Sequence, residues 1–172
     1  MKKGYLIAIV VALAEATTAP GLLRAQTKIS GSIGGVVPIG GTADRIKIGY
    51  QTAFAISLAQ SHSSDRIRLE AAFAELSDKV ATPVQRRITY ATANVVVASP
   101  SEPNAPAGYI IAGIGAYHQR AVGKGRDDAG LNVGAGITFT FGAFGAFTEA
   151  RLHYINGSTK TKLFPITFGL VF

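Results

Sequence analysis

The feature that most constrains this chain is an alternation, with a period of two, between apolar residues and small or polar ones. From Leu131 to Gly142 every odd position is apolar and every even position is glycine, asparagine or threonine. Residues 48–58 repeat the pattern, with mostly large apolar side chains on one face and small or polar ones on the other. Successive side chains of a strand point to opposite sides of a sheet, so the alternation predicts strands with two different faces.

Turn-forming residues divide the chain into further segments of the same kind. The segment Arg68–Leu76 also holds good helix formers, and an amphipathic helix is the alternative there, but its alternation favours a strand. Which face of residues 86–98 points outward stays open. The chain is therefore predicted to be all-β, with antiparallel up-and-down strands. These strands are expected near 28–40, 47–60, 65–78, 86–98, 108–120, 129–142, 144–156 and 162–172.

The composition indicates which face of these strands meets the solvent. The chain is 48% apolar and 16% charged, yet no apolar run reaches the roughly 18 residues of a membrane helix. Its non-apolar face consists mainly of small residues, which fit the narrow interior of an eight-stranded barrel. The apolar face would aggregate in water but is stable against lipid. We therefore predict an eight-stranded transmembrane β-barrel; an exported lipocalin-like carrier of an apolar ligand, with its apolar face inside, is an alternative.

The first 25 residues have the pattern of a helical signal peptide. Lys2 and Lys3 precede the apolar run 5–14, which is too short to span a bilayer. Cleavage after Ala25 is preferred and leaves residues 26–172 as the barrel; cleavage after Ala16 and an uncleaved anchor are the alternatives. The chain has no cysteine, which excludes disulfides, thiolate metal sites and a lipid anchor on cysteine.

Two of the predicted strands carry charges on the face that should line the interior. Arg68 and Glu70 lie on the third segment, and Glu149, Arg151 and His153 lie on the seventh. Isolated charges in a narrow lumen are costly, whereas pairs are tolerated. Since the third and seventh strands of an eight-stranded barrel lie opposite each other, these residues are predicted to form a luminal charge cluster. The alternative is that they face headgroups or solvent.

The end of the chain carries a family resemblance. Large apolar residues occupy every second position back from the last: Phe172, Leu170, Phe168, Ile166 and Phe164. This resembles the C-terminal signature of bacterial outer-membrane barrels that the barrel-assembly machinery recognises. Residues 107–117, 130–136, 147–151 and 165–170 look like the opacity-type and OmpA transmembrane-domain-like families.

The resemblance implies a bacterial outer-membrane location after export, periplasmic termini and lipid-facing aliphatic residues. The barrel-assembly machinery would be the partner during insertion. The chain has no tryptophan, so its tyrosines are expected to form the aromatic girdles at the membrane surfaces. The tyrosines in question are Tyr50, Tyr90, Tyr109, Tyr117 and Tyr154.

The net charge of +7 is expected to act at the outer surface. With periplasmic termini, the connections after the first, third, fifth and seventh strands face outward, and a basic rim lies near them. Its cations are expected to pair with lipopolysaccharide phosphates; ordinary solvated loops are the alternative. Nucleic-acid binding does not suit an exported barrel. The rim consists of Arg86, Arg87, Arg120, Lys124, Arg126, Lys160 and Lys162.

A catalytic site is not predicted. The barrel lipid A deacylases carry a His-x-Ser-Asn pattern, but after His153 the third position is Ile155, and the nearest serine is Ser158. No cofactor or metal is expected either, since the three histidines are scattered. The predicted function is a non-catalytic, monomeric outer-membrane barrel that contributes to envelope integrity or surface interaction. An outer-membrane lipid A-modifying enzyme is the alternative.

Overall fold

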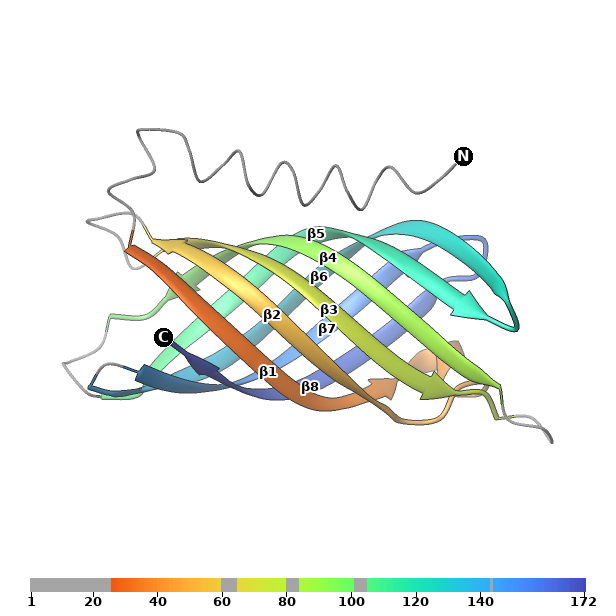
Figure 1. Ribbon diagram of the computed structural model, residues 1–172, viewed down its shortest axis with the longest axis horizontal. Helices are drawn as coiled ribbons and strands as arrows, with labels where there is room; N and C mark the ends of the chain where they lie inside the picture. The colour runs from red at the N-terminus through yellow and green to blue at the C-terminus, as the bar shows by residue number, and fades with distance from the viewer. Residues whose placement is uncertain (1–25, 60–64, 80–83, 101–104, 143) are drawn as a thin grey trace.

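The chain folds into a closed antiparallel barrel of eight strands, ordered β1 to β8, in which β8 pairs with β1 (Figure 1). This computed structural model describes residues 26–59, 65–79, 84–100, 105–142 and 144–172, so the expected signal peptide lies outside the described residues. In the described part, no helix is long and apolar enough to cross a membrane. The strands are β1 Gln26–Pro38, β2 Gly49–Ala59, β3 Arg66–Ser77, β4 Gln85–Ala98, β5 Ala107–Ala121, β6 Lys124–Phe141, β7 Phe144–Asn156 and β8 Thr161–Val171.

The all-β prediction is confirmed, and the residues that could have formed a helix lie in β3. One predicted break is wrong: residues 123–128 were expected to be a turn, but β6 already begins at Lys124. Val122 and Gly123 alone connect β5 to β6, with φ of 49° and 73°. Positive φ at both central residues is characteristic of a tight hairpin turn. The strand pairing therefore continues into polar sequence, where the apolar alternation that marks the other strands is absent.

The outer wall of the barrel is apolar. Ile137, Phe139 and Leu170 are all exposed, which places the large side chains of the alternating pattern on the outside. On β6 the apolar stretch runs from Ala129 to Phe139, about 33 Å of strand at 3.3 Å per residue. At a tilt of about 40° this corresponds to a band about 25 Å tall, the height typical of a transmembrane barrel. In a soluble carrier the large apolar side chains would instead point into the barrel.

Glycines on the inner face make room for the large side chains of the lumen. A Cβ atom at Gly134 would overlap the side chain of Arg151, and one at Gly136 would overlap the ring of Tyr109. Protein interiors tolerate such overlaps only by moving the neighbouring atoms. The small residues of β6 are therefore the counterpart of the bulky inward residues on the strands beside it.

The predicted girdle of tyrosines is only partly correct. Tyr50 is exposed on the outer wall, but Tyr90, Tyr109 and Tyr117 are buried in the lumen. They point inward because their hydroxyl groups find partners there, and a buried tyrosine hydroxyl usually requires one. On the outside, exposed phenylalanines gather instead near the end where β1 begins and β8 ends. They are Phe139, Phe141, Phe144, Phe168 and Phe172.

A hydrophobic plug fills the opposite end of the lumen. The loop between β1 and β2 contains a short 3-10 helix, η1 (Gly40–Thr42). This loop is held to the barrel by a hydrogen bond of 3.0 Å from the backbone N–H of Lys162 to Thr42 Oγ1 and by a bridge between Ile46 and Asp78. The plug consists of Val36, Ile46, Leu76, Ile88, Ile155 and Leu163, all at most 5% exposed.

Candidate functional site

An ionic network crosses the middle of the lumen between β3 and β7. Arg68 donates from Nη1 to Glu149 Oε2 over 2.7 Å, and Arg151 Nη2 lies 2.6 Å from Glu70 Oε1. Arg151 Nε is 2.6 Å from Glu149 Oε1, so the four residues form a continuous chain of alternating charge. Tyr109 also donates to Glu149 Oε2, over 2.7 Å. The four charged side chains are buried, and two guanidinium groups balance two carboxylates.

The structure thus brings together four of the five residues of the predicted luminal cluster. The fifth, His153, lies in a separate aromatic layer with Tyr90 and Tyr117. Its Nδ1 is 2.8 Å from the Tyr117 hydroxyl, and its ring centroid is 5.1 Å from that of Tyr90. Tyr90 donates in turn to Gln51 Oε1 over 2.9 Å. This layer lies between the ionic network and the hydrophobic plug, since the inward residues Glu149, Arg151, His153 and Ile155 follow one another along β7.

The residues considered for catalysis do not form a catalytic pair. His153 is bound to Tyr117 inside the barrel, whereas the Ser158 hydroxyl is 2.6 Å from Arg126 Nη1 in the connection between β7 and β8. A nucleophile requires its base within hydrogen-bonding distance. In the described residues, no group of three or more histidine, cysteine, aspartate or glutamate side chains is arranged to hold a metal ion.

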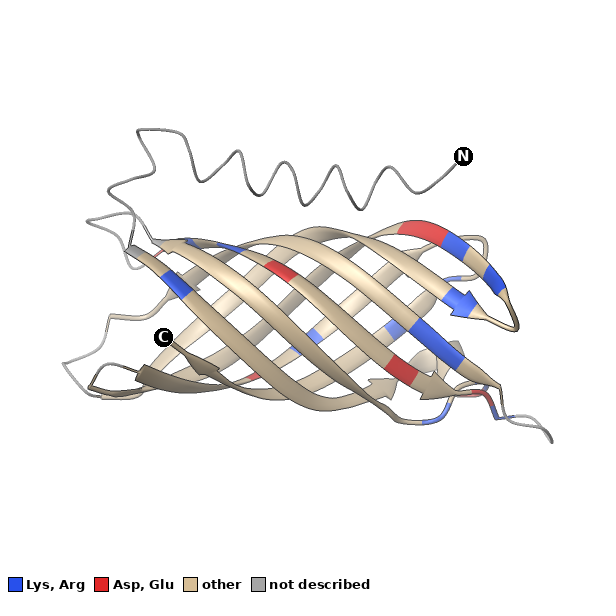
Figure 2. Ribbon diagram, viewed as in Figure 1, with Lys and Arg blue, Asp and Glu red and all other residues tan. Residues whose placement is uncertain are grey.

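The basic rim occupies the end of the barrel opposite the start of β1 and the end of β8, where most lysines and arginines gather in Figure 2. Three of its members are paired with acids: Arg86 with Asp78 at 3.1 Å, Arg87 with Glu75 at 3.1 Å and Arg126 with Asp128 at 2.6 Å. Within the described part of the chain, the other four form no ion pair: Arg120, Lys124, Lys160 and Lys162. These four are exposed to solvent.

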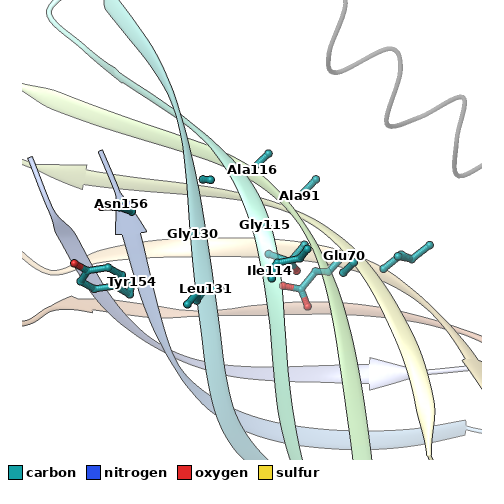
Figure 3. A pocket seen from close by; sticks show the side chains of 13 residues that line it. Glu70, Ala91, Ile114, Gly115, Ala116, Gly130, Leu131, Tyr154 and Asn156 are labelled. Carbon is teal, nitrogen blue, oxygen red and sulfur yellow. The ribbon is translucent and has the colours of Figure 1, made fainter. Parts of the chain in front are cut away.

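A groove of about 830 Å³ runs across the outer wall from β3 to β7 (Figure 3). It arises from strand register: Ala71, Ala91, Ala116 and Ala129 are successive cross-strand partners on neighbouring strands. The next row of partners also lines the groove, and all its members but Ala93 are larger: Leu69, Ala93, Ile114, Leu131 and Tyr154. The sequence analysis missed this groove because the four alanines are aligned only by the pairing of strands.

The residues of the predicted C-terminal insertion signal line the outer wall of β8. Ile166, Phe168 and Leu170 are exposed there, and Phe172 continues the same face. Phe164 is half-buried. The predicted signal thus lies on the apolar band, on the strand that closes the barrel against β1.

Comparison with solved structures finds the same fold in bacterial outer-membrane proteins. Neisserial surface protein A matches with a TM-score of 0.64 at 10% identity, over 86% of this chain and 97% of that one. The N-terminal barrel domain of Pseudomonas aeruginosa OprF gives 0.54 at 13% identity, over 87% and 100%. The outer membrane enzyme PagL gives 0.51 at 14% identity, over 84% and 97%.

The class of fold is therefore that of the small eight-stranded outer-membrane barrels, similar to the OmpA and opacity types. Neither a known family profile nor a curated protein sequence matches the chain.

Proposed function

We propose that the chain is an integral, non-catalytic protein of a bacterial outer membrane that contributes to envelope integrity by holding lipopolysaccharide. The observation that carries this proposal is the outer wall: an apolar band about 25 Å tall, with the cations of the basic rim grouped along one edge. Such a wall matches hydrocarbon, and a row of cations at its edge matches the phosphates of lipid headgroups.

The basic rim has a member suited to a headgroup phosphate. Arg120 and Arg87 are direct cross-strand partners on β5 and β4, and both are exposed. Like charges directly opposite each other destabilise a sheet. Glu75 neutralises Arg87, and within the described residues Arg120 has no acidic partner. A phosphate bound to Arg120 would supply the counter-charge that Arg120 lacks in the described part of the chain.

The groove lies below these arginines and suits an acyl chain of the same lipid. Ala91 and Ala116 are each four residues along the strand from Arg87 and Arg120, about 13 Å at 3.3 Å per residue. The larger apolar side chains of Ile114 and Leu131 line the groove next to the alanines. A phosphorylated glycolipid can therefore place its headgroup on the arginines and one acyl chain in the groove.

The alternative of a lipid-modifying enzyme is supported by the likeness to PagL in fold alone. Against it, the His153 side chain is buried in the lumen, where lipid does not reach it. Mass spectrometry of lipid A from cells with and without the protein separates the two functions. A change in acylation that depends on the protein would refute the non-catalytic role.

The lipopolysaccharide role is tested by reconstituting the full chain in vesicles with and without lipopolysaccharide. Lipopolysaccharide should raise the resistance of the barrel to urea, and the paired reversals Arg120→Glu and Lys124→Glu should remove most of that gain. The same variant in phosphatidylcholine vesicles is the control, where it should be at least as stable as the unchanged chain, because Arg120→Glu removes the like-charge pair with Arg87. Equal protection of both proteins by lipopolysaccharide would refute the role of the basic rim.

A further inference from the structure

The terminal mouth of the barrel, the end at which Gln26 and Phe172 lie, gathers three cations on its inner face. Lys28 on β1 is the cross-strand partner of Ser57, and Ser57 is the partner of Arg68, so the three side chains share the inner face. Arg66 precedes Arg68 by two residues on the same face of β3. These cations line a cavity of about 80 Å³ just inside the mouth.

The cations of this cavity have unused hydrogen-bonding capacity. Arg68 is 6% exposed and donates a hydrogen bond from Nη1 to Glu149, but its Nε is buried without a partner. The Nε of Arg66 is likewise buried without a partner. In the described part of the chain, neither Arg66 nor Lys28 forms an ion pair. Asp65 precedes β3 but does not line the cavity.

Two cations at this end lie outside the ionic network of the lumen. Arg68 and Arg151 are balanced by Glu70 and Glu149 in the ionic network, whereas Lys28 and Arg66 add two further positive charges. Buried or crowded cations without counter-charges are costly in a low-dielectric interior. Hydroxyl groups that can donate to an anion stand beside them, on Ser30, Ser57, Thr138 and Thr140.

We propose that this cavity binds a tetrahedral oxyanion of the phosphate class. The guanidinium group of Arg66 and the ammonium group of Lys28 supply the charge, and the Nε of Arg68 and the hydroxyl groups complete the hydrogen bonds. Arginine forks match phosphate oxygens well, and such charge-assisted bonds are short and strong. The phosphate enters either as a free ion or as the headgroup of a lipid in the adjacent leaflet. The proposal does not depend on lipopolysaccharide binding at the opposite end.

The test uses the full chain folded in neutral detergent micelles. Calorimetric titration with inorganic phosphate, at constant ionic strength set with chloride, should show one site per barrel when the basic rim carries the reversals Arg120→Glu and Lys124→Glu. The variant Arg66→Gln removes one charge-assisted contact, worth about 1.5–3 kcal/mol, so its affinity should fall at least about ten-fold. Lys28→Gln, at the rim of the mouth, should weaken binding in the same direction. Lys47→Gln, exposed in the loop between β1 and β2 and outside the basic rim, should leave the affinity unchanged.

The source of the phosphate is separated by a second titration, with a short-chain phosphatidic acid below its micelle concentration. Saturation by inorganic phosphate supports a free ion as ligand, and saturation by the lipid alone supports a headgroup. No binding of either probe would overturn the proposal, and so would equal binding by the Arg66→Gln and Lys28→Gln variants. Because Lys28 is exposed and makes no ion pair among the described residues, its variant tests the site even if Arg66→Gln fails to fold.

Discussion

Replacement of Glu149 by glutamine should cost more stability than replacement of Glu70, the other carboxylate of the ionic network. Its carboxylate contacts Arg68 at 2.7 Å, Arg151 at 2.6 Å and the Tyr109 hydroxyl at 2.7 Å. Without it, Arg68 stays buried with no carboxylate among its described contacts. Removing one partner of a buried pair typically costs about 3–5 kcal/mol. By contrast, Glu70→Gln leaves Arg151 its contact with Glu149, so we expect a loss of about half as much, roughly 2 kcal/mol.

The assay is urea unfolding in lipid vesicles, followed by circular dichroism, because the chain has no tryptophan to report by fluorescence. The midpoint should fall further for Glu149→Gln than for Glu70→Gln, with unchanged dependence on urea. The double variant Arg68→Gln with Glu149→Gln completes a cycle, and it should recover part of the loss because the unpaired cation is removed as well. The network does not have this role if Glu149→Gln lowers the free energy of unfolding by less than about 1 kcal/mol. It also does not have this role if Glu70→Gln lowers the free energy of unfolding by more than Glu149→Gln does.

Three further changes test the turn, the wall and the groove. Val122 adopts φ of 49°, a conformation that costs an L-residue about 1–2 kcal/mol and that asparagine adopts more readily. Val122→Asn should therefore raise the urea midpoint. A lower midpoint would contradict this turn geometry. Ile114→Arg places a charge on the apolar band and should lower the free energy of unfolding in vesicles by about 2–4 kcal/mol. Asn156→Arg, at the edge of the band, should lower it by only about 0–1 kcal/mol. Equal losses would contradict the position of the band in the membrane. Ala116→Trp should fill the groove and reduce the lipid A retained by the purified barrel in native mass spectrometry, whereas unchanged retention would remove the groove from the proposed function.

The fold was predictable because one signal carries most of it. Along β6, Leu131 to Phe141 alternate without a mismatch, and an inner face of small residues beside an apolar outer face is consistent with a narrow barrel in lipid. The start of β6 was not predictable in this way. Residues 124–128 pair with β5 beyond the apolar band, where neither face of the strand is apolar and the alternation therefore carries no information.

The candidate sites also differ in how far the sequence alone predicts them. The inward positions of Arg68 and Glu149 follow from the parity of their strands, and their approach follows from the circular order of eight strands. The groove depends on the register that aligns Ala91 with Ala116, which a sequence does not specify residue by residue. Tyr90, Tyr109 and Tyr117 were placed wrongly because an aromatic ring suits both a membrane surface and a crowded lumen. Only the neighbours, such as Gln51 beside Tyr90, decide between the two.

The order of the layers inside the barrel argues for a scaffold rather than a conduit. From the terminal mouth inward come its cations, the ionic network, the layer of Tyr90, Tyr117 and His153, and then the hydrophobic plug. A conducting path would have to open both the buried ion pairs and the apolar plug, each at a cost of several kcal/mol. The interior therefore serves stability, and the surfaces left for binding are the basic rim, the groove in the wall and the terminal mouth.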